Sequence, residues 1–222
     1  ALSEAVRQQA DALVRSGKTV VYVAVSGTAI GIIGAIDRLR DEAIETVRRL
    51  QHMGLRVMLL TGDRAAAAQL VAKSLSLPPD RVFADIRPDG KAGAIAAIQS
   101  QGHRVAMVGD GINDAPALAC ADVGIALHAG TEVAMETAQI VLMRDRLPDI
   151  LESIHLSRAT FGKIQQNLFW AFAYNAIGIP VAAGALIPAF GILLNPAVAA
   201  AMMALSSVSV VTNSLLLRWK FR

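Results

Sequence analysis

The sequence predicts an α/β domain with a parallel sheet, followed by a hairpin of two membrane-spanning helices. Segments with strand and helix patterns alternate through residues 41–143, and such alternation is typical of a parallel sheet. The stretch 164–217 contains no Asp, Glu, Lys, Arg or His. Hydrophobic residues make up 54% of the chain and the mean hydropathy is +0.47, so a membrane segment is expected.

The chain begins with an amphipathic helical pattern over 1–16. Strands over 19–25 and 29–36 follow, and the turn residues Ser26, Gly27 and Thr28 separate them, which indicates a β-hairpin. The alternating part then predicts, in order, a helix over 41–53, a strand over 56–60, a helix over 64–75, a strand over 82–84, a helix over 89–101, a strand over 104–108, a short helix after Asn113, a strand over 123–127, a helix from Thr131 and a strand over 139–143.

A helix from about Leu147 is expected to run without a break into the membrane. Two apolar spans, about 164–187 and 197–217, each exceed the roughly 20 residues that a helix needs to cross a bilayer core. Basic residues flank this hairpin at both outer ends, whereas the connection between the spans is uncharged. We therefore expect a multi-pass membrane protein whose α/β domain and C-terminus are cytoplasmic. The turn between the spans is assigned to Pro188, Gly191, Asn195 and Pro196.

Charge and cysteine content narrow the range of partners. The formal net charge is +3, with no Lys/Arg-rich stretch among aromatic residues, so no nucleic-acid partner is expected. The single cysteine, Cys120, excludes an internal disulfide framework and a Cys-x-x-Cys metal module within these residues. The chain shows neither a secretory signal nor an initial Met, so we expect it to be truncated at its N-terminus.

Two loops follow predicted strands at the sheet edge where ligands bind in such folds. Thr61-Gly62-Asp63 offers a hydroxyl, a glycine that allows close approach of backbone amides, and a helix N-terminus, although an ordinary turn with a helix cap has the same composition. The second loop carries Asp110 and Asp114 with glycines before and between them. Two such carboxylates suit Mg²⁺ with phosphate oxygens; the alternative is a capped turn, with Pro116 in the first turn of a helix.

Lys91 lies in the segment Pro88-Asp89-Gly90-Lys91, at the start of a predicted helix between these loops. Its ammonium group could reach over the same crevice and neutralise phosphate charge. The simpler alternative is a solvated lysine in a first helical turn.

Together these residues resemble, in order and spacing, the haloacid-dehalogenase-like, Rossmann-like phosphorylation domain of P-type ATPases. The string Gly109-Asp-Gly-Ile-Asn-Asp-Ala-Pro-Ala-Leu118 is very specific to that family. The resemblance covers essentially all 222 residues, and its further matches are Asp37-Arg-Leu-Arg40, Thr61-Gly62-Asp63, Pro88 to Lys91, Asp122-Val-Gly-Ile-Ala126 and Gly130-Thr131 through Glu136. His128-Ala129 and Glu132 depart from the family pattern, outside the Mg²⁺ and phosphate positions.

The resemblance implies an ATP-driven aspartyl-phosphate cycle with Mg²⁺ as cofactor. It implies that Asp110 binds Mg²⁺, that Asp114 supports that site, and that Thr61, Gly62 and Lys91 contact the phosphoryl group or nucleotide. Asp63 and Asn113 complete the implied catalytic set.

Four motifs of the family do not occur in these residues: Asp-Lys-Thr-Gly-Thr, Thr-Gly-Glu, His-Pro and Cys-Pro-Cys. The resemblance therefore implies a missing N-terminal half of the same pump as partner. Without the aspartate that becomes phosphorylated, we expect the chain alone neither to hydrolyse ATP nor to transport.

The two spans resemble those of the heavy-metal subgroup, in which two helices follow the phosphorylation domain. Asn167, Tyr174, Asn175 and Pro180 have the spacing N-x6-Y-N-x4-P, and Met203-Ala-Leu-Ser206-Ser207 reads M-x-x-S-S; both resemble the copper(I) subgroup. Cu(I) prefers soft ligands such as thioethers. The copper pathway is therefore assigned to Tyr174, Asn175, Met203 and Ser207, with Cu⁺ as the transported ion. A copper chaperone is an expected partner that could deliver it.

Several alternatives remain open at this point. The polar residues of the spans could serve only helix packing, and methionine could be filler. The ion could be silver, or zinc or cadmium, although a zinc-type pump would be expected to carry a charged residue in these spans. A membrane-anchored phosphatase of the same superfamily would need its own Asp-x-Asp-x-Thr loop, and the sequence has none. The chain could also act only by pairing with a complementary chain.

The predicted organisation has five parts. They are 1–36, the end of the nucleotide-binding domain and the return strands; 37–146, the phosphorylation domain; 147–163, a linking helix; 164–217, the last two transmembrane helices; and 218–222, a cytoplasmic tail.

Overall fold

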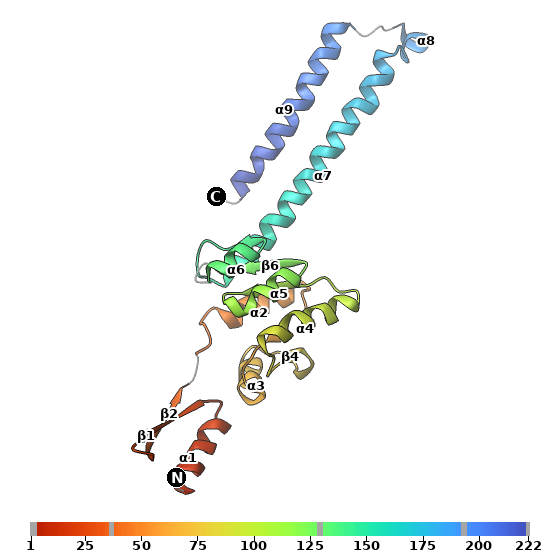
Figure 1. The fold of residues 1–222 in the computed structure, drawn as a ribbon. Coiled ribbons are helices and arrows are strands. Elements are labelled where there is room, and N and C mark those ends of the chain that lie inside the picture. Colours follow the sequence, from red (N-terminus) through yellow and green to blue (C-terminus); the bar gives the residue numbers. More distant parts are fainter. Residues whose placement is uncertain (1–3, 36–37, 128–130, 192–194, 221–222) are drawn as a thin grey trace. The chain divides into compact units, whose positions relative to one another are not determined.

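The computed structural model describes residues 4–35, 38–127, 131–191 and 195–220, and divides into two compact units (Figure 1). The first unit ends at Leu151 and the second begins at Glu152. Some residues named in the sequence predictions lie outside the described ranges. They are residues 1–3 of the predicted first helix, Ile36 of the predicted second strand, Asp37 and Gly130 of the family matches, His128-Ala129 of the departures from the family pattern, and the basic C-terminal residue Arg222. The finer division into five parts stays a prediction.

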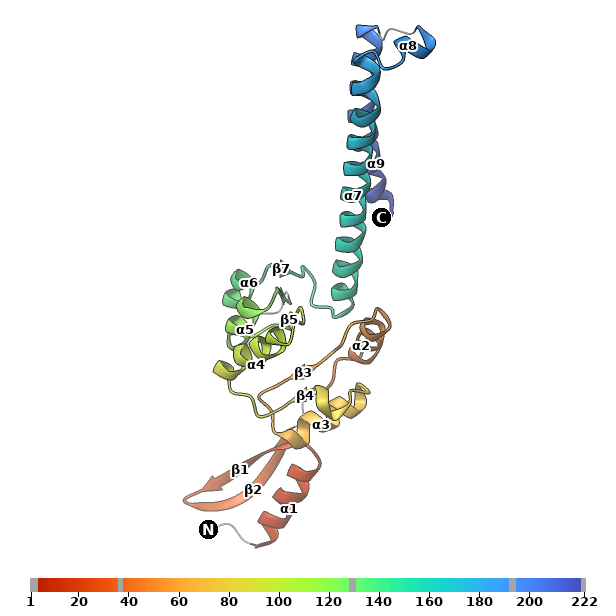
Figure 2. The same ribbon diagram turned by 90° about the vertical axis from the view of Figure 1, so that its right-hand side faces the viewer.

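The first three elements form a helix beside a β-hairpin (Figure 2). They are α1 (Glu4–Arg15), β1 (Thr19–Val25) and β2 (Thr28–Ala35). The two loop residues Ser26 and Gly27 have φ values of 48° and 78°, and a two-residue loop with two positive φ angles matches the twist of antiparallel strands. The predicted hairpin is confirmed, with Thr28 in the second strand rather than in the turn.

The alternating part of the first unit contains short strands and longer helices. It comprises α2 (Ala43–His52), β3 (Leu59–Leu60), α3 (Ala65–Ser74), the 3₁₀ turn η1 (Pro79–Arg81), β4 (Val82–Phe83), α4 (Pro88–Ser100), β5 (Ala106–Gly109), the 3₁₀ turn η2 (Ile112–Asp114), α5 (Ala115–Cys120), β6 (Val123–Ala126), α6 (Glu132–Thr137) and β7 (Ile140–Val141). The predicted order is confirmed. The strands predicted over 56–60 and 139–143 were too long, because only two residues of each form ladder hydrogen bonds.

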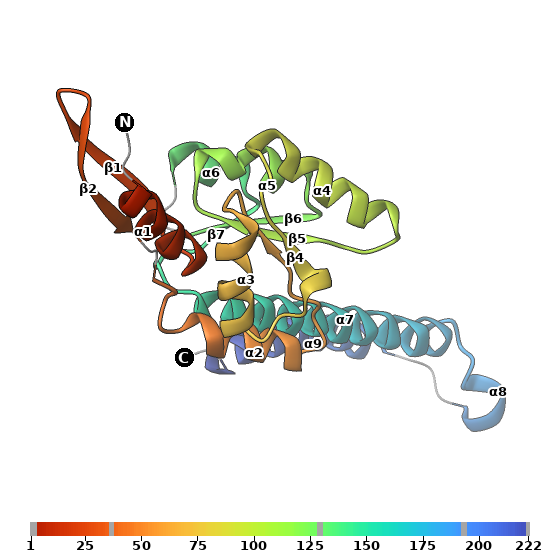
Figure 3. The ribbon, with the colours of Figure 1, turned by 90° about the horizontal axis from the view of Figure 1, so that it is seen from below.

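All strand pairs of this part are parallel, as predicted. β3 pairs with β4, and β5, β6 and β7 form a second sheet in chain order. The hydrogen bonds thus join the described strands into two sheets instead of one. Figure 3 shows α4 and α5 along the same side of the β5–β6–β7 sheet.

A small apolar core fixes the ends of β3 and β5 near each other. Ile95 of α4 and Ala117 of α5 are 2% and 0% exposed, and Leu60 and Met107 pack against their cluster. Leu60 is the last residue of β3, and Met107 belongs to β5. Burial of these side chains therefore brings the two loops that follow the strands to one place.

The second unit is a helical hairpin built from α7 (Pro148–Ala182), the short α8 (Ile187–Phe190) and α9 (Pro196–Lys220), except that the first four residues of α7 belong to the first unit. The predicted unbroken helix from Leu147 is confirmed in α7. The predicted span 164–187 was too long, because Gly184 ends the helix with a φ of 93°. The Gly184 N–H donates to Val181 O (3.1 Å) and the Ala185 N–H to Pro180 O (3.0 Å), which is the Schellman arrangement.

Within the described ranges, only α9 is long and apolar enough to cross a membrane. The candidate span is Ala200–Trp219, with a mean hydropathy of 1.6. In α7 the amide side chains of Gln165, Gln166, Asn167 and Asn175 reduce the hydropathy. The crossing by α7 therefore stays a prediction.

Polar side chains join α7 to α9 near the end of the hairpin that carries the basic residues. The Lys163 ammonium donates to Asn213 Oδ1 (2.7 Å), and the Asn213 amide donates to Asn167 Oδ1 (2.8 Å). The Asn167 amide in turn donates to Ser214 Oγ (2.8 Å). Such bonds hold membrane helices together, so the described contacts of Asn167 are those of a helix-packing residue.

Candidate functional site

A cleft of about 240 Å³ lies at the carboxyl ends of β3 and β5. It is lined by Leu60, Lys91, Met107, Val108, Gly109, Asp110, Asp114, Leu127 and Leu147. The structure thus brings together three of the predicted residues, Lys91, Asp110 and Asp114. Each comes from a different local element: the first turn of α4, the loop after β5, and the end of η2.

Lys91 and Asp114 form a largely buried ion pair. The Lys91 Nζ lies 2.6 Å from Asp114 Oδ1, and the two side chains are 14% and 12% exposed. The Gly111 N–H donates to the other carboxylate oxygen at 3.4 Å. The alternative of a freely solvated lysine is therefore wrong, and the Asp114 charge is already balanced inside the cleft.

Gly109 leaves the space that Asp114 occupies. A Cβ on Gly109 would lie 2.8 Å from Asp114 Cβ and 3.0 Å from its Cγ. The Gly109 carbonyl also accepts the Leu127 N–H at 3.2 Å, which ties the end of β5 to the residue after β6. A side chain at this position would have to displace either the backbone or the ion pair.

We expect Gly109→Ala to destabilise the chain by about 1–3 kcal/mol, the usual range for overpacking. Thermal unfolding of the purified chain would measure this loss. The matched control is Gly93→Ala in α4, where a Cβ would meet nothing within 4 Å and where alanine should be neutral or stabilising. Equal melting temperatures for the two variants would show that Gly109 is not sterically constrained.

Asp110 contributes a second carboxylate to the cleft, which differs from that of Asp114 in its partners. Its backbone carbonyl accepts the Thr131 N–H at 2.8 Å, which holds the loop after β5 against the start of α6. Within the part of the chain that the structure describes, no hydrogen bond or ion pair engages its side chain. Its charge is therefore available to a cation.

Arg40 was not among the predicted site residues. It forms an ion pair with Asp145 at 2.9 Å, and this hydrogen-bonded contact raises the pKa of Arg40, with a smaller contribution from the charge of Asp110. Arg40 thus adds positive potential on the side of Asp110. The only sequence signal for it was its place at the end of the matched segment Asp37-Arg-Leu-Arg40.

Thr61, Gly62 and Asp63 form a turn directly after Leu60, and backbone hydrogen bonds join this turn to the segment 83–86. The Thr61 hydroxyl donates to Asp63 Oδ2 (2.9 Å) and accepts the Asp63 N–H (3.1 Å). A Cβ on Gly62 would lie 3.3 Å from the Ile86 carbonyl oxygen. None of the three lines the cleft, so their predicted contact with phosphate stays a prediction.

Asn113 lies in η2 with an exposed side chain and does not line the cleft either. Its catalytic role therefore stays a prediction.

The donor set of the cleft fits Mg²⁺ better than a transition metal. The described residues contain no group of three or more His, Cys, Asp or Glu side chains that could hold a metal ion. Mg²⁺ is usually held by one or two carboxylates together with phosphate oxygens and water. Asp110 supplies one carboxylate outside the Lys91–Asp114 pair, and the Lys91 ammonium has N–H donors beyond the one that Asp114 accepts.

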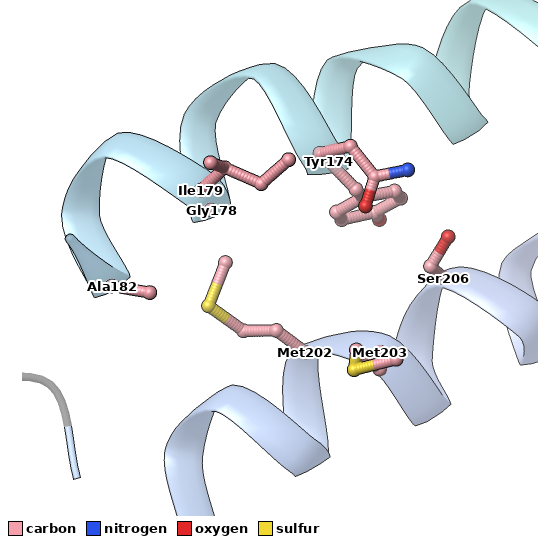
Figure 4. Close-up of a pocket in the computed structure, with 8 residues that line it drawn as sticks. Tyr174, Gly178, Ile179, Ala182, Met202, Met203 and Ser206 are labelled. Atoms are coloured by element: carbon pink, nitrogen blue, oxygen red, sulfur yellow. The ribbon is translucent and has the colours of Figure 1, made fainter. Parts of the chain in front are cut away.

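A second pocket, of about 160 Å³, lies between α7 and α9 (Figure 4). It is lined by Tyr174, Asn175, Gly178, Ile179, Ala182, Met202, Met203 and Ser206. Three of the four predicted copper-pathway residues, Tyr174, Asn175 and Met203, are among them. Ser207 is not, and its hydroxyl donates to the Met203 carbonyl of its own helix at 3.4 Å.

The donors of this pocket are neutral and include two thioethers. The Asn175 amide nitrogen donates to the Ala171 carbonyl at 3.1 Å, which fixes the orientation of its side chain. Sequence reasoning missed Met202 and placed Ser206 only inside the M-x-x-S-S string. Among these neutral groups, the thioether sulfurs are the donors suited to a soft monovalent ion.

Comparison with known proteins identifies the family of the chain. The family model of the haloacid dehalogenase-like hydrolases matches residues 1–122. Over 209 residues, 94% of this chain and 25% of the relative, the chain is 49% identical to a silver exporting P-type ATPase of Salmonella typhimurium. It is 52% identical over 203 residues, 91% of this chain and 27% of the relative, to a probable copper-transporting ATPase of Synechococcus elongatus.

The fold is similar to that of a zinc-transporting PIB-type ATPase solved in an E2.Pi state. The TM-score is 0.79 at 33% identity, over 97% of this chain and 34% of the other. The chain spans about a quarter of the length of the curated relatives it matches, 25% and 27%.

Proposed function

We infer that this chain, which belongs to the haloacid dehalogenase-like hydrolases and within them to the heavy-metal P-type ATPases, is the C-terminal portion of an ATP-driven copper(I) pump. The pump would move the ion out of the cytoplasm through an aspartyl-phosphate cycle. The rest of the pump, including the phosphorylated aspartate, would come from residues beyond these 222.

The observation that carries this proposal is the pocket between α7 and α9. It places the Met203 thioether among the same lining residues as Tyr174 and Asn175. No charged residue occurs anywhere from 164 to 217, so the pocket is built for an ion that binds soft, neutral donors. The curated relatives quoted above, whose names state silver and copper, support this choice.

Zinc or cadmium is the second candidate, because the similar solved structure is that of a zinc-transporting pump. Zn²⁺ is bound in proteins by Cys, His and carboxylate ligands. The hairpin residues 164–217 have none of these, so we favour copper(I), with silver(I) as an ion of the same chemistry.

In the cleft of the first unit we propose that Asp110 holds Mg²⁺ and that Lys91, fixed by Asp114, faces the phosphoryl group. Mg²⁺ would neutralise phosphate charge as phosphoryl transfer proceeds. We further propose that Thr61 and Gly62 meet the phosphoryl group or ATP once the turn adjusts. Asp63 would hold the Thr61 hydroxyl, and Asn113 would join when the site closes.

We place the first unit and the C-terminus in the cytoplasm and both helices of the hairpin in the lipid bilayer. The basic flanks of the hairpin support this orientation. A copper chaperone is a proposed source of the ion.

Met203→Ala in the complete pump tests the ion assignment. The affinity for Cu(I) should fall at least about tenfold, since even the loss of a residue that only supports a ligand costs about that much. Phosphorylation from inorganic phosphate should persist, because the cleft is untouched. The control is Met143→Ala, which removes an exposed thioether of the first unit. Unchanged Cu(I) affinity in the Met203 variant would count against the proposal.

A further inference from the structure

We propose that Met202 supplies a second thioether to the ion in the pocket between α7 and α9. The N-x6-Y-N-x4-P and M-x-x-S-S patterns leave Met202 out. The proposal rests on the proposed function of the hairpin, because it names a further residue that would contact the ion and contribute to the selection of a soft one.

The orientation of α9 separates Met202 from Met203. Consecutive residues of a helix point about 100° apart, whereas residues four apart share a face. Met202 therefore shares a face with Ser206, and both are partly covered. Met203 shares the next face with Ser207, and its side chain is 73% exposed. In this hairpin Met202 is thus the more enclosed of the two thioethers.

The Met202 side chain extends from α9 toward α7 and ends near Gly178 and Ala182 (Figure 4). A Cβ built on Gly178 would lie 3.6 Å from Met202 Cε, so the methyl end of the thioether faces the side of α7 at Gly178. The small residues Gly178 and Ala182 leave the space into which this side chain reaches. The sulfur is thereby held among the lining residues.

The two thioethers give the pocket soft donors on two adjacent faces of one helix. Tyr174 and Asn175 provide oxygen donors from the opposite helix. Soft thioethers favour Cu(I) and Ag(I) over Zn(II), which prefers nitrogen, thiolate and carboxylate ligands. An ion that enters the pocket beside Met203 would meet the Met202 sulfur further inside, on the side of α7.

The competing explanation is that Met202 only fills space between the helices, as methionine commonly does. Met202→Leu separates the two, because leucine has nearly the same volume and no sulfur. A filler could be replaced without effect on the ion. A ligand could not.

The experiment uses the complete pump in detergent, with Cu(I) under reducing conditions as the probe. We expect Met202→Leu to lower the Cu(I) affinity about tenfold and to remove one sulfur neighbour of copper from the X-ray absorption spectrum. Phosphorylation from inorganic phosphate should be unchanged. Met202→Cys, which keeps a soft sulfur, should retain more affinity than the leucine variant. Met143→Leu is the control for thioether loss elsewhere.

Unchanged affinity and an unchanged sulfur count in Met202→Leu, with losses in Met203→Leu, would overturn this proposal and leave the proposed function in place. A wild-type pump that binds no Cu(I) in its membrane part would overturn both. The wild-type measurement therefore distinguishes the two failures.

Discussion

Asp110→Asn in the complete pump is expected to lower the steady-state ATPase rate by about 10²–10³-fold, the scale of losing one electrostatic contact to a transition state. Asp114 is neutralised by Lys91 at 2.6 Å, so the carboxylate of Asp110 is the anionic group left in the cleft for Mg²⁺. Asparagine keeps the size and removes the charge. The rate of ATP hydrolysis and the decay of radiolabelled phosphoenzyme would both report the loss.

Asp89→Asn is the matched control for this variant. Asp89 is exposed in the first turn of α4, two residues before Lys91, and it does not line the cleft. Its ATPase rate should stay close to that of the wild type. A normal rate in the Asp110 variant would refute the assignment of Mg²⁺ to this carboxylate.

Lys91→Met should produce the largest loss of stability among substitutions in the cleft. It leaves the Asp114 carboxylate, 12% exposed, without its counter-charge, and breaking a buried pair from one side costs about 3–5 kcal/mol. We expect about 2–3 kcal/mol here, since both side chains keep slight contact with water. Denaturant unfolding of the purified chain, followed by circular dichroism, would measure this change.

The double variant Lys91→Met/Asp114→Asn should recover part of that loss. Asparagine removes the uncompensated charge and can still accept the Gly111 N–H, which now donates to Asp114 at 3.4 Å. If the two single effects simply add, the residues are not coupled and the ion pair is not what holds this part of the cleft together.

Much of the first unit could be predicted because its signals are local. The order of strands and helices follows from periodicity and turn residues, and the two loops after β3 and β5 follow from that order. The Lys91–Asp114 pair and the contact of Arg40 with Asp145 join residues 23 and 105 positions apart. Their geometry depends on packing of the core around Ile95 and Ala117, which a linear pattern does not contain.

The orientation of the two hairpin helices toward each other could not be predicted from the sequence either. The M-x-x-S-S spacing indicates which residues of α9 share a face, but not how that face is turned toward α7. The structure turns Met202 and Ser206 inward, and Met203 with Ser207 one face further round. Gly184 was also missed as the end of α7, because a glycine inside an apolar run gives no signal until the backbone around it is known.

The most direct test of copper(I) transport is the metal dependence of ATP hydrolysis by the complete pump in detergent. Cu(I), Ag(I), Zn(II) and Cd(II) would be compared under reducing conditions at equal free concentrations. We expect stimulation by Cu(I) and Ag(I) alone. Stimulation by Zn(II) or Cd(II) would contradict the copper assignment, while leaving the chain among the heavy-metal P-type ATPases.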